Sequence, residues 1–188
     1  MSERAEFFNN IASDPRYKYK QILEDIAIKN GNFILDYGCG GGFFSYSFSS
    51  LVGSKGKVFA SDINTDFLRY VEIKSKEKNL LNIRTVHIDD LQTYLIDGML
   101  DIIFFRNVIH HISNRVKPFK KIKNYLKENG RIFIIDYTPE GNKMGYGPPG
   151  HYVNVQDLIY DMEKAGYALL ETKEYLLPAQ SFSVFIKS

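Results

Sequence analysis

Short apolar runs recur along the chain, and each of the first four is followed or closed by a charged side chain. The runs are rich in Ile, Val and Phe and too short for helices, so the pattern predicts buried strands. We expect strands over residues 33–36, 57–61, 83–88, 100–105, 131–136, 168–177 and 182–187. Helical spacing of apolar residues separates the runs, and this alternation is typical of an α/β sheet.

Helical spacing, capping residues and prolines mark the segments between the strands. We expect helices over 2–12, from Pro15 to a cap at Gly31, over 43–51, from Asn64 or Thr65 through Ile73, and over 91–95, 115–127 and 155–165. Residues 138–153 contain three prolines and four glycines and are predicted to be one long irregular loop that binds substrate.

Four glycines within five residues, at positions 38, 40, 41 and 42, follow the first strand. Glycine is kept where the backbone needs φ > 0 or where a ligand lies against bare peptide. A dinucleotide-binding loop would have glycine in place of Phe43, and a phosphate-binding loop would add a lysine. No lysine or arginine lies between Asp36 and Lys55, so Asp36 favours a cationic ligand over a pyrophosphate. S-adenosylmethionine, with its ammonium and sulfonium groups, fits this loop.

The sequence Asp36-x-Gly38-x-Gly40-x-Gly42 resembles the first motif of the class I S-adenosylmethionine-dependent methyltransferases. Residues 58–63, 88–90, 100–105 and 129–136 resemble the following motifs in the family's order, and the likeness covers roughly residues 22–188. The segment after the fourth strand is similar to that of the small-molecule, quinone-type (type 11-like) branch.

This resemblance implies a doubly wound α/β fold. Its sheet has seven mostly parallel strands in the order 3-2-1-4-5-7-6, an antiparallel last strand and helices on both faces. Residues 1–188 would form a single domain, in which residues 1–31 are helices that cap the site.

The resemblance also implies roles for residues at the strand ends. Asp62 would accept hydrogen bonds from the ribose diol, Ile63 would pack on the adenine ring, and Asp89 or Asp90 would accept from the adenine amino group. Arg106 and Asn107 would contact the methionine part of the cofactor. The predicted cofactor-binding residues are Asp36, Gly38, Cys39, Gly40, Gly42, Asp62, Ile63, Asp89, Asp90, Arg106 and Asn107.

Helix capping is the alternative role for these acids. Asn64 can cap the helix that follows Asp62, which leaves Asp62 for the ligand. We expect one of Asp89 and Asp90 to cap the helix at 91–95 and the other to contact adenine.

His110 and His111 follow the fourth strand, at the edge where open α/β sheets bind ligands. Imidazole titrates near pH ~6.5 and can take a proton from an acceptor as the methyl group leaves sulfur. Both are therefore catalytic candidates, and His110 is favoured because it stands nearer the strand end. The alternative is that one hydrogen-bonds the backbone and the other packs. We expect no metal site, because adjacent side chains should diverge and no third ligand stands three or four residues away.

Composition limits the partners and the location. The 24 basic and 22 acidic side chains give a net charge of +2, and no aromatic residues interleave with the lysines of 115–127, so we expect no nucleic-acid partner. One cysteine, the lack of an apolar signal core and the lack of eighteen consecutive apolar residues favour a soluble, cytoplasmic protein without a membrane partner. We expect a monomer or a homodimer.

Together these features predict an S-adenosylmethionine-dependent methyltransferase that acts on a small-molecule acceptor and releases S-adenosylhomocysteine. Three alternatives stay open: a methyltransferase for RNA or protein, an NAD(P)-dependent oxidoreductase, and an inactive methyltransferase-like binding subunit. Phe43 and the C-terminal strand pair argue against the oxidoreductase. Intact acids at positions 36, 62 and 89 argue against the inactive subunit.

Overall fold

The structure is a computed structural model that describes residues 2–188, without the side chain of Ser2. Seven strands form a sheet in the order β3-β2-β1-β4-β5-β7-β6, which is the predicted order. The last strand runs antiparallel to both of its neighbours, as predicted. The chain divides into two compact units, Met1–Ile96 and Asp97–Ser188.

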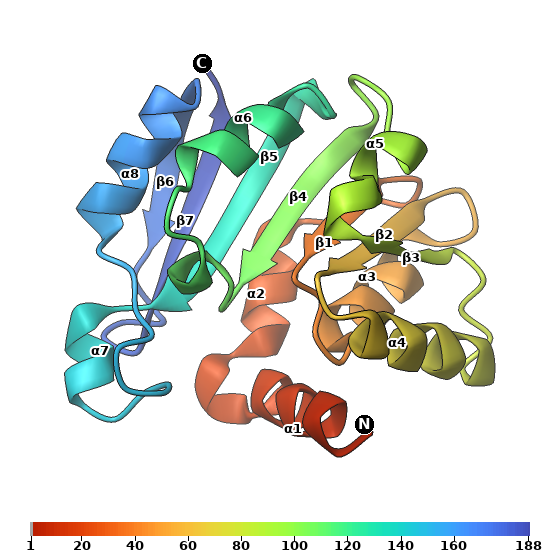
Figure 1. The fold of residues 1–188 in the computed structure, drawn as a ribbon, viewed down its shortest axis with the longest axis horizontal. Helices are drawn as coiled ribbons and strands as arrows, with labels where there is room; N and C mark the ends of the chain where they lie inside the picture. Colours follow the sequence, from red (N-terminus) through yellow and green to blue (C-terminus); the bar gives the residue numbers. More distant parts are fainter. Residues whose placement is uncertain (1) are drawn as a thin grey trace. The chain divides into compact units, whose positions relative to one another are not determined.

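The first unit holds three parallel strands and the helices that connect them (Figure 1). Its elements are α1 (Ser2–Ser13), η1 (Pro15–Tyr17), α2 (Tyr19–Ile26), β1 (Phe33–Tyr37), α3 (Phe43–Val52), β2 (Lys57–Asp62), α4 (Thr65–Glu77), β3 (Ile83–His87), η2 (Ile88–Asp90) and α5 (Leu91–Tyr94). Helices α3 and α4 pack on the strands, and Ile34, Val58 and Val71 are fully buried between them. Because the strands are parallel, their carboxyl ends meet at one edge, where the glycine loop, Asp62 and η2 lie.

Helix α1 packs directly on the glycine loop. The Asn9 side chain donates to the Gly41 carbonyl at 2.9 Å and accepts from the Phe43 amide at 3.0 Å. The N-cap of α3 is Gly42, which has no side chain, so Asn9 caps this helix from another element. A Cβ atom on Gly41 would clash with the Ala5 carbonyl oxygen and with Asn9.

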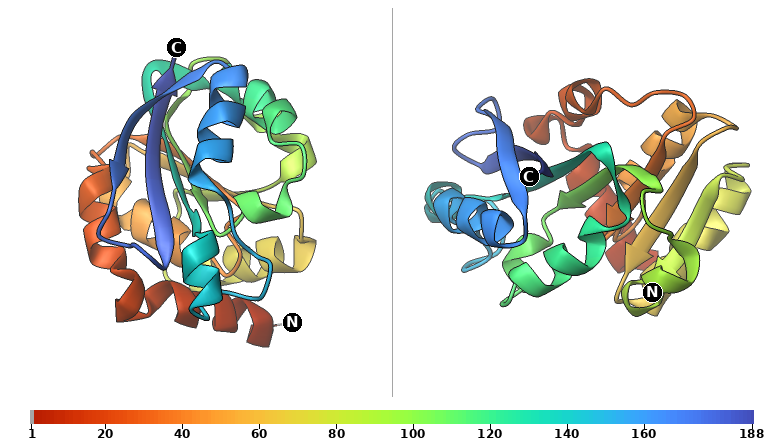
Figure 2. Two further views of the ribbon diagram at one scale, coloured as in Figure 1. Left: turned by 90° about the vertical axis from the view of Figure 1, so that its left-hand side faces the viewer. Right: turned by 90° about the horizontal axis from the view of Figure 1, so that it is seen from above.

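The second unit combines parallel and antiparallel pairing. Its elements are β4 (Leu100–Arg106), η3 (Ile109–His111), α6 (Val116–Lys123), β5 (Leu126–Tyr137), α7 (Pro139–Lys143), α8 (Val155–Lys164), β6 (Tyr167–Lys173) and β7 (Gln180–Lys187). Strand β4 is parallel to β5, and β7 pairs with β5 so that Gln180 lies opposite Tyr137. Helix α8 lies beside β6 (Figure 2). The start of β7 therefore joins the ends of β4 and β5 at one edge.

The second predicted helix is broken, which is a correction to the sequence analysis. Asp14 caps the start of this segment by accepting from the Arg16 amide, but only the turn η1 follows, and Lys18 with φ of 49° ends it. Helix α2 stops before Ala27, which has φ of 52°, and not at Gly31. Tyr17, Ile22 and Ile26 are all buried. A continuous helix could not place residues five apart on one face, so the break lets Tyr17 reach the core.

Three predicted boundaries in the second unit are also wrong. The helix expected over 115–127 ends at Lys123, because Leu126 already pairs with Leu100 of β4. The expected irregular loop contains α7, whose first amides are capped by Thr138. Strand β6 ends at Lys173 because its pairing with β7 stops there, at Phe182.

No helix in the described part of the chain is long and apolar enough to cross a membrane.

Replacing Asn9 with Ala should lower the free energy of unfolding by about 1 kcal/mol, a typical loss for a helix N-cap. The Phe43 amide and the Gly41 carbonyl would both lose a partner. Asn10→Ala, on the exposed face of the same helix, is the control and should leave stability nearly unchanged. Urea unfolding measures both variants. If Asn9→Ala were as stable as Asn10→Ala, the capping role would be wrong.

Candidate active site

The glycine loop is shaped by backbone hydrogen bonds to the neighbouring strand. The amides of Gly38 and Cys39 both donate to the Ser61 carbonyl, at 2.7 and 2.9 Å. Gly38, Gly40 and Gly42 have φ angles of 79°, 52° and 84°, in the left-handed region that favours glycine. The predicted need for positive φ in this loop is confirmed at these three positions.

Asp62, the last residue of β2, ties the loop to the strand. Its Oδ2 atom accepts from the Gly40 amide at 3.0 Å, and its Oδ1 atom accepts from the Asn64 amide at 2.9 Å. Asn64 caps α4, as predicted, by accepting from the Asp66 amide at 2.9 Å. A phosphate-binding loop directs its amides at the ligand, whereas the Gly40 amide here is taken by a carboxylate. The loop therefore suits a cation better than a pyrophosphate.

Asp36 and Cys39 complete the loop. Asp36 is buried and accepts a 2.5 Å hydrogen bond from the Ser45 hydroxyl of α3. Burial of the Cys39 thiol, followed by the charges of Asp36 and Asp62, raises the pKa of that thiol well above its ordinary value. The thiol is therefore protonated at neutral pH and adds no charge of its own.

Asp89, Asp90 and Ile63 are accessible from solvent. The Asp89 side chain is 85% exposed, and Ile63 is 72% exposed. His87, not an acid, caps η2: its Nδ1 atom accepts from the Asp89 amide at 3.3 Å. Asp90 makes no side-chain capping bond to α5 within residues 2–188, so the expected cap is wrong. The reason is that η2 runs directly into α5 and is capped as one unit. The adenine contacts of these residues stay predictions.

Arg106 is the last residue of β4 in the second unit, and Asn107 follows it directly. Asn107 has φ of 55°, a conformation that Asn tolerates better than most residues. Its side-chain Nδ2 atom donates to the Tyr137 hydroxyl at 3.3 Å, and its side-chain Oδ1 atom accepts from the Gln180 side chain at 2.6 Å. This network fixes the Asn107 side chain. The cofactor role of both residues stays a prediction.

His110 is paired with a buried carboxylate. Its Nδ1 atom lies 2.6 Å from Asp136 Oδ1, and its amide donates to Asp136 Oδ2 at 3.2 Å. The two side chains are 4% and 0% exposed. Because a carboxylate only accepts, the neutral imidazole carries its proton at Nδ1 and keeps a lone pair at Nε2. That lone pair can accept a proton or bind a metal ion.

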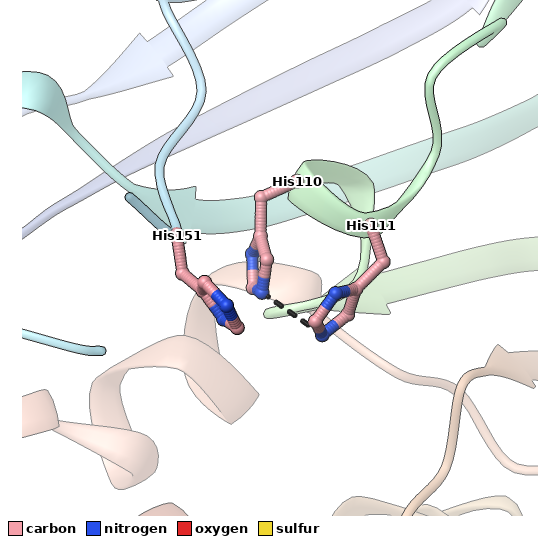
Figure 3. A group of neighbouring side chains, drawn as sticks. All are labelled: His110, His111 and His151. Carbon is pink, nitrogen blue, oxygen red and sulfur yellow. Dashed lines mark hydrogen bonds between the residues drawn. The ribbon is translucent and has the colours of Figure 1, made fainter. Parts of the chain in front are cut away.

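The neighbouring histidines converge, which corrects the expectation that they diverge. His110 Nε2 and His111 Nε2 are 3.1 Å apart, and the two rings are 4.1 Å apart at their centroids. His151 brings a third ring to within 4.9 Å of the His110 centroid and 5.0 Å of the His111 centroid. Burial and the neighbouring imidazoles of His110 and His151 lower the pKa of His111. Figure 3 shows the three rings pointing toward one another.

Sequence patterns did not predict the roles of three side chains at these sites. Asn9 caps α3, Asp136 orients His110, and His151 joins the histidine pair. Asp136 did carry a signal, since it closes an apolar strand as Asp36 and Asp62 do. His151 carried none beyond its place in a loop expected to bind substrate.

Comparison with known proteins identifies the family. A methyltransferase domain family matches residues 28–172. The ubiquinone/menaquinone biosynthesis C-methyltransferase UbiE of Francisella philomiragia is 28% identical over 120 residues, which cover 63% of this chain and 48% of that protein. The chain thus spans about half the length of the curated relatives that it matches.

Solved structures share the fold. A SAM dependent methyltransferase from Aquifex aeolicus superimposes with a TM-score of 0.87 at 22% identity, over 100% of this chain and 99% of that chain. A putative type 11 methyltransferase from Sulfolobus solfataricus has a TM-score of 0.69 at 23% identity, over 93% and 92%. The chain therefore belongs to the methyltransferase domain family, with the class I, S-adenosylmethionine-dependent fold that its motifs predict.

Proposed function

We propose that this protein transfers the methyl group of S-adenosylmethionine to a small-molecule acceptor in the cytoplasm. The observation that carries the proposal is the bond from the Gly40 amide to Asp62. It places a carboxylate where a dinucleotide-binding loop would offer donors to phosphate, and the buried Asp36 adds a second acid beside the same loop. A cationic cofactor is the ligand that this charge pattern favours.

Asp62 still has acceptor capacity for the ribose of the cofactor. Each carboxylate oxygen can accept two hydrogen bonds, and each accepts one from the backbone, from Gly40 or from Asn64. One lone pair on each oxygen therefore remains for the two hydroxyls of a ribose diol. The exposed Ile63 follows directly and offers an apolar surface for the adenine ring.

A small-molecule acceptor is supported by the relatives. UbiE of Francisella philomiragia is named for C-methylation in ubiquinone and menaquinone biosynthesis, and quinone precursors are small molecules. The match covers about half of that protein, so the acceptor of this chain is proposed by class and not by name.

Residues His110 and Asp136 supply the chemistry that such an acceptor needs. Methyl transfer is an in-line displacement at carbon, in which positioning and exclusion of water do most of the work. An acceptor that starts protonated must also lose its proton. Asp136 holds the proton of His110 at Nδ1, and Nε2 is left as the proton acceptor. His110 is thus the proposed base, and Asp136 is its positioning residue.

Calorimetric titration tests the cofactor. S-adenosylmethionine and S-adenosylhomocysteine should both bind, and NAD should not. Asp62→Ala should weaken both ligands alike, by about 1.5–3 kcal/mol, because they share the ribose whose hydrogen bonds to a charged acceptor are lost. Asp97→Ala removes an exposed carboxylate elsewhere and should leave both affinities unchanged. Tight NAD binding, or loss of only one of the two sulfur ligands, would contradict the assignment.

Single-turnover methyl transfer tests the base once an acceptor is in hand. His110→Ala should lower the rate by roughly 10²- to 10⁴-fold, the usual contribution of a general base, while the affinity for S-adenosylhomocysteine stays nearly intact. Asp136→Asn should lower the rate as well, because an amide no longer fixes the proton at Nδ1 of the imidazole. A loss below about threefold in His110→Ala would rule out the base.

Cys39 gives a separate test that the cofactor lies on the glycine loop. Alkylation needs the thiolate, and the raised pKa of Cys39 leaves little thiolate at neutral pH. Iodoacetamide should therefore react slowly at pH 7, and the rate should keep rising beyond the pH at which an ordinary cysteine levels off. Saturating S-adenosylhomocysteine should slow the reaction further. Mass spectrometry follows the modification, and equal rates with and without the ligand would place the cofactor elsewhere.

A further inference from the structure

We propose that His110, His111 and His151 form a three-imidazole site for a divalent first-row transition metal, with Zn²⁺ as the best fit. Two of the ligands come from η3 and the third from the segment after α7 (Figure 3). One nitrogen from each ring can be chosen so that all three lie within 4.8 Å of one another.

The spacing of the nitrogens suits a shared ion. Zinc binds imidazole nitrogen at about 2.0–2.1 Å in tetrahedral geometry, which sets two ligand nitrogens roughly 3.3–3.4 Å apart. His110 Nε2 and His111 Nε2 are already 3.1 Å apart. A metal ion between these two nitrogens would use the lone pairs of both rings.

Asp136 supplies the outer support that such sites require. Histidines that bind metal commonly donate their other ring N–H to a carboxylate, which fixes the tautomer and aims the free nitrogen at the ion. His110 does this through Nδ1, at 2.6 Å from Asp136 Oδ1. The carboxylate is fully buried and also accepts from the amides of His110 and Tyr137, so it is held in one orientation.

The segment that carries His151 is held in place from both sides. Asn142 donates to the Pro148 carbonyl at 2.8 Å and accepts from the Gly150 amide at 2.9 Å. Two residues beyond His151, the Val153 amide donates to the Tyr137 carbonyl at 2.8 Å, and Val153 is buried. His151 therefore has a fixed place beside the strand end that positions His110.

The ligand set selects the metal. Neutral imidazoles suit Zn²⁺, Cu²⁺ and Ni²⁺, whereas Mg²⁺ and Ca²⁺ prefer oxygen ligands. Three protein ligands leave the fourth position of a zinc ion open, as in catalytic zinc sites. A hydroxyl or thiol bound there would lose its proton more readily, because the cation stabilises the anion. This last step, which would make the acceptor a metal-binding alcohol, phenol or thiol, rests on the proposed methyltransferase function; metal binding itself does not.

Zinc competition with a chromophoric chelator tests the site. The full chain, without a histidine tag and stripped of metal, should bind one Zn²⁺, and Mg²⁺ should not compete. His151→Ala and His111→Ala should each weaken Zn²⁺ by at least about tenfold, and Asp136→Asn by roughly 10- to 100-fold. His87→Ala is the matched control, because His87 is the one histidine of the chain outside the cluster. It should bind Zn²⁺ as the unaltered protein does.

Cobalt gives a second readout that needs no enzyme activity. Bound Co²⁺ should show the strong visible absorption of a four-coordinate ion, and His151→Ala should lose it. Thermal unfolding of each variant shows whether it still folds. If no Zn²⁺ binds, or if a folded His151→Ala binds it as tightly as His87→Ala does, the site is wrong. These measurements contain neither cofactor nor acceptor, so their failure leaves the proposed function untouched. Methyl transfer with and without a chelator then separates a metal-assisted acceptor from a histidine base.

Discussion

The hydrogen bond between Asp62 and the Gly40 amide is the constraint on which the first unit depends. It fastens a loop of four glycines to the end of the neighbouring strand, and the amides of Gly38 and Cys39 add two more bonds to the same strand. Glycine is needed at four positions of this path, because three of them have positive φ and the fourth lies against α1. Asn9 then completes the start of α3. The same contact places the negative charge of the Asp62 carboxylate against the loop.

A second buried carboxylate organises the other unit. Asp136 has no exposed surface, and a buried charge is costly unless hydrogen bonds satisfy it. Three N–H groups do so here: two from His110 and one from Tyr137. The carboxylate therefore holds both the backbone and the ring of His110. The same strand end anchors Val153 through the Tyr137 carbonyl, which brings His151 close. One short segment of β5 thus positions His110 and the segment that carries His151.

The two roles considered for His110 use the same lone pair. An Nε2 atom that takes a proton from an acceptor cannot also bind a metal ion at that moment. A metal would activate the acceptor itself, and Asp136 would support the imidazole equally well in either role. Both roles are compatible with a class I methyltransferase domain.

Sequence patterns alone predicted the strands and the acids at their ends, because strand period, glycine spacing and capping are local properties of the chain. The order of the strands was predicted from the resemblance to the class I methyltransferases, and the sheet confirms it. Sequence patterns also placed Asn64 as a helix cap. Tertiary packing decided the rest. The predicted second helix is interrupted at Lys18, and Tyr17 before it is buried in the core. Pairing with β4 sets the start of β5. His151 lies beside His110 although the two residues are 41 positions apart in the sequence. Such contacts depend on how the strands and loops pack in three dimensions. The periodicity of the sequence does not indicate which distant side chains will lie together at one edge of a sheet.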